Sequence, residues 1–348
     1  MTIIGLTENC GFDLHSKWKH GSHNLITDVP GVKVGNVTIN DGDIHTGVTA
    51  VLPHGGNIFQ DKVMAGVSVI NGFGKSIGLI QIEELGTIET PIILTNTLSI
   101  GTAWSALTKY MLEQNEDIGV STGTVNCVIT ECNDGRLNDI RGLHVKEENI
   151  FEALKCADET FEEGAVGGGT GMVCLGLKGG IGSSSRVVNV DGEDYTIGAL
   201  VMSNFGSAGN LVIGGKHYDT SKYSQFPEKD EGSIIMLIAT DIPLSERQLK
   251  RVSKRAMISL GRVGSYCGDG SGDIAITFTT GNRLKHYSEK NILETKMFYD
   301  DKIDVVFEAA VEAVEEAIVS SLWHAETMEG IRGRKVLGLK EFIDKYGE

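Results

Sequence analysis

The chain has 348 residues, and its formal net charge of −16 opposes non-specific binding to nucleic acid or to an anionic membrane, so neither is expected as a partner. Hydrophobic residues make up 41% of the chain, enough for a large core, but the uncharged apolar stretches are far shorter than the roughly 20 residues that cross a bilayer. Because residues 1–10 also lack the basic region and apolar stretch of a secretory signal, we expect a soluble cytoplasmic protein.

The first third of the chain is rich in predicted strands. Residues 25–39 combine a turn with alternating valines, and the β pattern continues over residues 46–52. Short apolar runs at residues 67–71 and 91–94 are further strand candidates. Between them, residues 77–85 fit either a helix or a strand near a turn.

Helical spacing then becomes frequent. Residues 96–115 predict a helix with one apolar side, formed by Ile100, Trp104, Leu107, Tyr110 and Met111. A second helix is predicted over residues 147–163. A third begins at the capping-box sequence Ser245-Glu-Arg-Gln248 and runs to about Leu260.

The C-terminal part predicts a strand and then a long helix. The strand covers residues 274–278 and the helix residues 303–323. Apolar spacing of alternately four and three residues gives the helix one buried side, made of Ile303, Phe307, Ala310, Val314, Ala317 and Ser321. Strands thus alternate with helices, but without the regular cadence of a doubly wound parallel sheet, and we predict packed β-sheets covered by helices.

Glycine is unusually common, with 45 residues against 5 prolines, and it concentrates in residues 164–182, 204–209 and 264–273. Such backbone can approach a ligand or another chain segment very closely. No repeat or clear linker is visible, so residues 1–348 are expected to form one catalytic domain. The only plausible break is residues 217–232, whose polar, charged composition fits an exposed loop that can be cut while both pieces stay packed together.

The step from Gly232 to Ser233 is the most informative point of the chain. A polar tract ends in glycine there, and serine opens an apolar, β-branched run typical of a buried strand. If the Ser233 hydroxyl cuts the bond before it, the new chain begins with a residue that has both a nucleophile and an amine. An α-amino group has a pKa of about 7.7 to 8.0, so much of it is neutral near pH 7 and can take the hydroxyl proton. The same pattern also fits a loop that ends where an ordinary buried strand begins.

Nucleotide and metal sites are not indicated. The phosphate-loop spacing before Gly74-Lys75-Ser76 requires a glycine at position 69, which is Val69, and the glycines of residues 164–182 miss the dinucleotide-binding register. Nine histidines form no metal-binding motif, and six dispersed cysteines include no Cys-x-x-Cys pair. We expect no cofactor, no metal and reduced cysteines, so the chemistry must come from hydroxyls, carboxylates, amides and lysine.

Seven segments, in order and spanning most of the chain, resemble the DmpA-type aminopeptidases, a family that includes β-peptidyl aminopeptidases and nylon-oligomer hydrolases. They are Asp28-Val-Pro-Gly-Val-Lys-Val-Gly, Glu131-Cys-Asn-Asp-Gly-Arg-Leu-Asn-Asp-Ile, Gly168-Gly-Thr-Gly-Met-Val, Leu177-Lys-Gly-Gly-Ile-Gly, Ser203-Asn-Phe-Gly, Gly232-Ser-Ile-Ile and Gly270-Ser-Gly-Asp. The resemblance implies a four-layer α/β/β/α sandwich. It also implies autocleavage into an α piece, residues 1–232, and a β piece, residues 233–348, and assembly into a homo-oligomer, a tetramer of processed units.

The resemblance also assigns catalytic residues. Ser233 corresponds to the nucleophile, and Ser271 with Asp273 to the serine and acid that orient its amine, although some relatives have glutamate in place of Asp273. Asn204 corresponds to the asparagine that holds the oxyanion. Lys178 corresponds to a lysine near the nucleophile in the nylon-hydrolase branch, but a surface lysine fits the sequence nearly as well.

Two further residues are expected to bind the substrate. Glu131 resembles the acid that receives the free amino group of the substrate, with an exposed, salt-bridged glutamate as the alternative. Asn133 stands where some relatives have a tyrosine near the oxyanion, a departure that bears on specificity.

The function expected from these residues is that of an autoprocessed serine aminopeptidase or amidase that acts on small peptides or amino-acid amides through an acyl-enzyme on Ser233. One alternative is acyl transfer, as in the related ornithine acetyltransferase. Serine at position 233 and the peptidase-like segment 131–140 favour hydrolysis. The other alternative is a glycine-rich ligand-binding or assembly protein without enzymatic activity.

Overall fold

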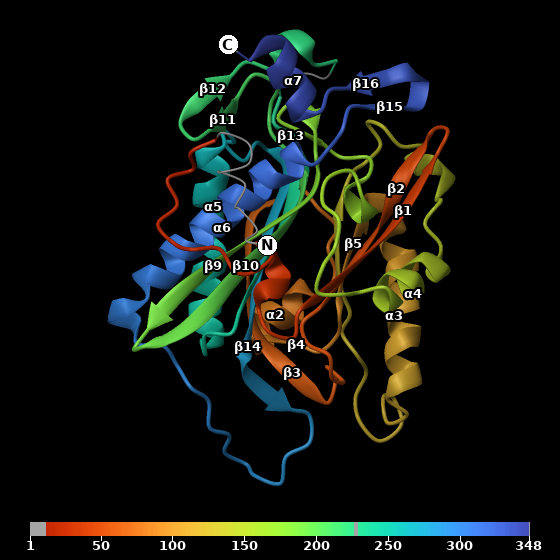
Figure 1. Cartoon of the computed structure of the whole chain (residues 1–348). Coiled ribbons are helices and arrows are strands. Elements are labelled where there is room, and N and C mark those ends of the chain that lie inside the picture. Colours follow the sequence, from red (N-terminus) through yellow and green to blue (C-terminus); the bar gives the residue numbers. More distant parts are fainter. Residues whose placement is uncertain (1–11, 226–228, 348) are drawn as a thin grey trace.

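Two β-sheets lie face to face in the centre of the molecule, and helices cover the outer face of each sheet (Figure 1). This computed structural model describes residues 12–225 and 229–347, so the prediction about a signal in residues 1–10 lies outside the described residues. The layers follow in the order helix, sheet, sheet, helix. The expected α/β/β/α sandwich is therefore confirmed.

The smaller sheet has four strands in the order β1-β2-β5-β6, with α3 and α4 on its outer face. Strand β5 pairs in parallel with β6 and antiparallel with β2. The elements are β1 (Lys33–Asp41), β2 (Ile44–Leu52), β5 (Ile92–Asn96), β6 (Val128–Cys132), α3 (Ile100–Gln114) and α4 (Glu147–Lys155).

The larger sheet has six strands in the order β4-β3-β14-β13-β10-β9, and α5 and α6 pack on it. One of its two central strands, β13, pairs antiparallel with β10 and in parallel with β14. The elements are β3 (Asp61–Gly72), β4 (Thr87–Ile88), β9 (Gly180–Val190), β10 (Glu193–Asn204), β13 (Glu231–Thr240), β14 (Gly270–Lys285), α5 (Glu246–Arg262) and α6 (Asp304–Trp323).

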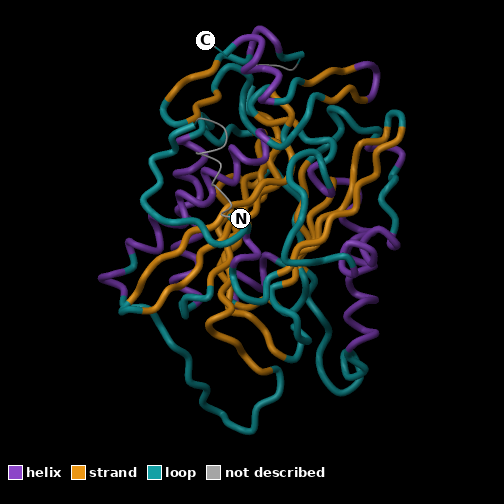
Figure 2. Tube along the Cα trace, viewed as in Figure 1, coloured by secondary structure: helices purple, strands orange, loops and turns teal. Residues whose placement is uncertain are grey.

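Smaller elements lie around the sandwich, as the tube in Figure 2 also shows. Helix α2 follows β3, and α7 precedes the C-terminus. The described residues also contain three two-stranded ribbons. The elements are α2 (Leu79–Leu85), α7 (Leu339–Tyr346), β7 (Val173–Cys174) with β8 (Leu177–Lys178), β11 (Leu211–Ile213) with β12 (Lys216–Tyr218), and β15 (Met328–Gly330) with β16 (Arg334–Val336).

From Ser233 onward, strand β13 is apolar on both faces because each face is covered. Ile235 and Leu237 point into the core between the sheets, whereas Ile234 and Met236 belong to the core under α5 and α6. A strand buried on both faces has a continuous apolar sequence rather than an alternating one. This explains the uninterrupted run after Ser233.

Three helix predictions differ from the structure. Helix α4 ends at Lys155 instead of continuing to residue 163, and the chain then crosses to the strands as a loop. Trp104, predicted on the buried side of α3, is 42% exposed, because the buried side includes Ala103 and Ala106 besides Ile100, Leu107 and Met111 and so is turned away from Trp104. Helix α6 is buried almost all round rather than on one side.

Helix α6 approaches β9 very closely, and Gly182 makes this possible. A Cβ atom at position 182 would lie 2.0 Å from the carbonyl oxygen of Ala317 in α6. Only glycine therefore fits at this contact. The close approach brings acidic residues of α6 against a buried arginine of β9.

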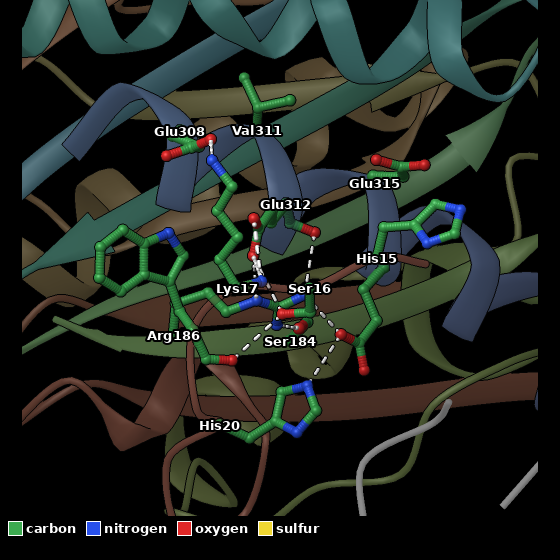
Figure 3. Close-up of polar contacts among 12 residues, drawn as sticks. His15, Ser16, Lys17, His20, Ser184, Arg186, Glu308, Val311, Glu312 and Glu315 are labelled. Atoms are coloured by element: carbon green, nitrogen blue, oxygen red, sulfur yellow. Dashed lines mark hydrogen bonds and ion pairs between the residues drawn. The ribbon is translucent and has the colours of Figure 1, made fainter. Parts of the chain in front are cut away.

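The guanidinium of Arg186 lies in the interior between two carboxylates of α6. Figure 3 shows it beside one of them, Glu312. Its Nη2 is 2.6 Å from Oε2 of Glu316, and its Nε is 3.3 Å from Oε2 of Glu312. Nε2 of His20 also lies 3.0 Å from Glu316. Burial alone raises the pKa of Glu316, but the hydrogen bond with His20 and the charge of Arg186 lower it to about 2. The charges thus compensate one another.

Replacing Arg186 with methionine should destabilise the protein strongly. The substitution leaves the carboxylates of Glu312 and Glu316 buried without their cation, a loss of about 3–5 kcal/mol in the free energy of unfolding. Urea unfolding measures the change. As a matched control, Lys109→Ala breaks the exposed pair with Glu147 and should cost less than about 1 kcal/mol. Equal losses in the two variants would contradict the importance of the buried cluster.

Candidate active site

Strand ends from both sheets gather at one edge of the sandwich and surround a cavity of about 820 Å³. Strands β3, β5, β6 and β10 end near this edge, and β13 and β14 begin there. The cavity is lined by Phe73, Lys75, Thr97, Glu131, Asn133, Gly135, Arg136, Ile140, Asn204, Lys229, Asp230, Glu231, Gly232, Ser233, Tyr266, Gly268, Asp269 and Gly270.

Ser233 lies in the wall of this cavity and is 4% exposed. Its Oγ donates a hydrogen bond to the carbonyl oxygen of Gly232, the residue before it. Gly232 has a φ of +145°, and a Cβ atom there would lie 2.0 Å from the carbonyl oxygen of Asn204. The position before Ser233 therefore requires glycine for both conformation and space.

The predicted exposed loop at residues 217–232 is only partly exposed. Most of its described residues face solvent, while residues 226–228 lie outside the described part. Asp230, however, is buried, and its carboxylate accepts hydrogen bonds from Gly206 N and from Ser265 Oγ, both at 2.9 Å. The end of the tract next to Gly232 is therefore held firmly, because a buried carboxylate retains its hydrogen-bond donors.

Asn204, the last residue of β10, is the register partner of Ser233. Its Oδ1 accepts a hydrogen bond from Val173 N, and its Nδ2 donates to the carbonyl oxygen of Asn133, each at 3.0 Å. The carboxamide is buried and lines the cavity. Both of its ends are thus fixed beside the Ser233 hydroxyl.

Ser271 and Asp273 flank Gly272, the residue of β14 that pairs with Ser233. They share one face of the strand, and Ser271 Oγ donates to Asp273 Oδ1 at 2.6 Å. Because side chains alternate along a strand, the Ser233 side chain points with that of Ile235 toward the core between the sheets. The side chains of Ser271 and Asp273 lie on the opposite face of the sheet. The pair is therefore suited to contact the backbone nitrogen of Ser233 rather than its hydroxyl, and it does not line the cavity.

The carboxyl of Asp273 is buried, and burial raises its pKa to about 6. The hydrogen bond from Ser271 lowers the pKa, but it does not offset the loss of hydration and the nearby charge of Asp230, and Oδ2 of Asp273 has no hydrogen-bond partner among the described residues. The site thus holds a carboxyl whose ionised form is poorly stabilised until a positive charge lies near it.

Glu131, in β6, reaches the same cavity from the smaller sheet. It is 3% exposed, and it forms hydrogen bonds rather than a salt bridge, so the alternative of an exposed, salt-bridged glutamate is wrong. Lys75 N donates to Oε1 at 2.8 Å, and Thr97 Oγ1 donates to Oε2. A carboxylate held in this way is preorganised to accept a cation.

The remaining two predicted residues lie at different depths. Asn133 is exposed at the cavity wall, and its Oδ1 accepts a hydrogen bond from Gly135 N. Lys178 is completely buried, so the alternative of a surface lysine is wrong. Its ammonium donates to three backbone carbonyls and does not line the cavity.

Sequence reasoning missed several residues of the cavity. Phe73 and Tyr266 are both about 60% exposed and supply its aromatic surface, and Arg136 donates to the carbonyl oxygen of Glu231. Lys75 belongs to the tripeptide that failed as a phosphate loop, yet its backbone binds Glu131. Single residues in loops carry no spacing signal that could have identified them.

Among residues 12–225 and 229–347, His, Cys, Asp and Glu side chains form no group of three or more that could hold a metal ion. The same part of the chain contains no helix with the length and hydropathy of a membrane span.

Known proteins resemble this chain in sequence over most of its length. The model of peptidase family S58 matches residues 24–336. The β-peptidyl aminopeptidase BapA of Sphingosinicella microcystinivorans is 38% identical over 359 aligned residues, which cover 94% of this chain and 89% of that protein.

Solved structures agree over the whole fold. The PH0078 protein of Pyrococcus horikoshii OT3 superposes with a TM-score of 0.92 at 53% identity and covers 98% of this chain and 99% of its own. The L-aminopeptidase D-Ala-esterase/amidase of Ochrobactrum anthropi, described as a prototype of the serine aminopeptidases and a variant of the Ntn hydrolase fold, gives 0.88 at 36% identity, with 98% of each chain covered.

Replacing Asp273 with asparagine should stabilise the uncut chain at pH 7 but not at pH 4. Folding raises the pKa of the Asp273 carboxyl from 3.8 to about 6, so the folded state favours the protonated form. The free energy of unfolding therefore falls as the pH rises from about 4 through 6 and the carboxyl ionises. The gain at pH 7 is at most about 3 kcal/mol, from about 1.4 kcal/mol per pKa unit. Urea unfolding at both pH values in a Ser233→Ala background, which keeps the chain whole, measures it. A gain that is independent of pH would contradict the raised pKa.

Proposed function

The chain belongs to peptidase family S58 and is a hydrolase of the serine aminopeptidase type; we propose that it cuts itself before Ser233 and then removes N-terminal residues from small peptides or amino-acid amides. The family confirms the resemblance to the DmpA-type aminopeptidases. It favours hydrolysis over the alternatives of acyl transfer and non-enzymatic binding. The observation that carries the proposal is one cavity with Ser233 opposite Asn204 and with Glu131 in its wall.

Self-cleavage starts from the contact between Ser233 and Gly232. The Ser233 Oγ attacks the carbonyl carbon of Gly232, the C–N bond breaks, and an ester replaces the amide while the nitrogen gains a proton. Water then hydrolyses the ester, leaving a carboxylate on Gly232 and a free α-amino group on Ser233. The buried Asp230 supports this step because it fixes the chain two residues before the bond.

The freed amino group then acts as the base for its own hydroxyl. When Ser233 attacks a substrate amide, the amine takes the hydroxyl proton and becomes an ammonium. The neighbouring Ser271–Asp273 pair is proposed to stabilise this positive charge from the backbone side, a role that the register of β13 with β14 supports. The leaving amine receives the proton, and water later hydrolyses the acyl-enzyme.

Asn204 is proposed to stabilise the oxyanion of both tetrahedral intermediates. Its Nδ2 has a second hydrogen besides the one donated to Asn133, and the carboxamide lies beside the attacking hydroxyl. An amide donor in this role elsewhere contributes about 3–4 kcal/mol.

Glu131 is proposed to bind the free amino group of the substrate. Its carboxylate already accepts hydrogen bonds from Lys75 N and Thr97, and it has further acceptor capacity on the cavity side. This contact limits hydrolysis to the first residue of a peptide. The expected homotetramer and cytoplasmic location stay predictions, and so does the choice between L-, D- and β-amino acid derivatives, for which Asn133 is a candidate determinant.

Mass spectrometry of the purified protein tests self-cleavage. We expect two pieces, residues 1–232 and 233–348, and hydrolysis of amino-acid p-nitroanilides or amides. Ser233→Ala removes the nucleophile and should leave one uncut chain with activity reduced about 10³-fold or more. Ser259→Ala, which removes a buried hydroxyl in α5, is the matched control and should leave cleavage and activity intact. An uncut but active wild-type protein would contradict the mechanism.

Replacing Glu131 with glutamine should weaken the recognition of free amino groups. The variant loses the negative charge, and its amide group places N–H donors next to Lys75 N and Thr97 Oγ1, which now donate to the carboxylate. We therefore expect kcat/KM to fall about 10²-fold, mainly through a higher KM. Steady-state kinetics with an amino-acid amide measures the loss. The exposed Glu329→Gln is the control. If the wild-type enzyme hydrolyses the N-acetylated amide equally well, Glu131 does not have this role.

A further inference from the structure

The two hydrogen bonds that orient the Asn204 carboxamide go to the backbones of two different loops. Val173 N comes from the glycine-rich segment 167–174, and the carbonyl oxygen of Asn133 comes from segment 133–138. The direction of the Nδ2 hydrogens therefore depends on how firmly both loops are held. Each loop proves to be anchored by a buried charged side chain.

Segment 133–138 is anchored by Asp134, the residue after Asn133. Its carboxylate is fully buried and does not line the cavity. Thr46 Oγ1 donates to Oδ2 at 2.6 Å, and Asn138 Nδ2 donates to Oδ1 at 3.0 Å. The carboxylate thus ties this segment to β2 and closes its turn.

The glycine-rich segment is anchored by Lys178. The ammonium donates to the carbonyl oxygens of Gly169 at 3.2 Å, Met172 at 2.8 Å and Gly179 at 2.6 Å. Met172 directly precedes Val173, whose N–H binds Asn204. All three hydrogens of the ammonium are used, so the segment cannot shift without breaking a buried hydrogen bond.

The two anchors carry opposite charges and act on each other. Burial raises the pKa of Asp134 to about 6 and lowers that of Lys178 to about 7, and the charge of each opposes the shift of the other. Besides Asp134, Cys174 also raises the pKa of Lys178. Burial and the charge of Lys178 lower the pKa of His45. A buried charge is tolerated in this way when an opposite charge and hydrogen bonds compensate it.

We propose that Asp134 and Lys178 are positioning residues that hold the Asn204 carboxamide in the orientation required for oxyanion stabilisation. The proposal rests on the proposed function of Asn204. It gives Lys178 a place behind the cavity wall rather than at the reacting atoms, and it assigns a role to Asp134, which sequence reasoning did not identify.

Asp134→Asn tests the proposal. The new amide sets a donor against the hydrogens of Thr46 or Asn138, so the segment should shift and Asn204 should lose its fixed direction. We expect kcat per cleaved enzyme to fall about 10- to 100-fold while KM changes less than about twofold, because the lost interaction is made in the transition state. Glu163→Gln, which changes a partly buried carboxyl that accepts hydrogen bonds from Ser183 N and Ser320 Oγ, should change neither constant.

A double-mutant cycle separates positioning from general damage. In an Asn204→Ala background, Asp134→Asn should lower kcat by less than about twofold, since no carboxamide is left to orient. A loss as large as in the wild-type background would overturn the proposal. If Asp134→Asn does not fold, Thr46→Val takes its place, because it removes one hydrogen-bond donor to the Asp134 carboxylate. The same changes in kcat are then expected, but smaller.

Crystal structures of the Asp134→Asn and Glu163→Gln variants, which keep Asn204, supply a readout that does not depend on activity. The expected result for Asp134→Asn is an intact fold in which the hydrogen bond between Asn204 Nδ2 and the carbonyl of Asn133 is lost or the carboxamide has two orientations. An unchanged Asn204 in Asp134→Asn would overturn the proposal. A wild-type protein without amide hydrolysis would instead refute the proposed function, while the crystal structures still test the positioning.

Discussion

The structure depends above all on the pairing of β13 with β10 on one side and with β14 on the other. This pairing sets Ser233 opposite Asn204 and opposite Gly272, and so places a hydroxyl, a carboxamide and the Ser271–Asp273 pair around one residue. A shift by one residue would turn the Ser233 side chain to the other face of the sheet. The apolar residues after Ser233 prevent such a shift because each face of β13 packs against its own core.

Burial of polar groups is the second theme of the molecule. Arg186, Lys178, Asp134 and Glu316 are all buried, and each is compensated by hydrogen bonds and an opposite charge. Asp273 differs from them in its partners. It accepts the hydrogen bond from Ser271, but its Oδ2 has no hydrogen-bond partner among the described residues, and burial and the nearby charge of Asp230 both raise its pKa. The proposed reaction creates a positive charge on the nitrogen of Ser233, whose register partner in β14, Gly272, lies between Ser271 and Asp273.

Much of this was predictable from the sequence. The alternation of strand patterns and helical spacings predicted packed sheets covered by helices, because such patterns record packing along a continuous stretch of chain. The ordered motifs predicted the family, and the resemblance implied the four layers. The exposed Trp104 and the early end of α4 were not predictable, since tertiary contacts decide them. The same holds for Phe73, Arg136 and Tyr266 in the cavity, which tertiary folding brings together from separate loops. The burial of Lys178 and the anchoring role of Asp134 likewise depend on partners distant in sequence.

The charge cluster of Arg186 has a consequence for the order of events during maturation. Arg186 and His20 lie before the proposed cut, whereas Glu312 and Glu316 lie after it, so this buried cluster joins the two products. Because the strands that shape the cleavage geometry also come from both sides of the bond, the cut can only follow folding. Once the bond is broken, two separated pieces could reassociate only by diffusion, and in each piece the charged groups of the cluster would lack their partners. The mature protein is therefore expected to persist through a high barrier to dissociation rather than through reversible refolding.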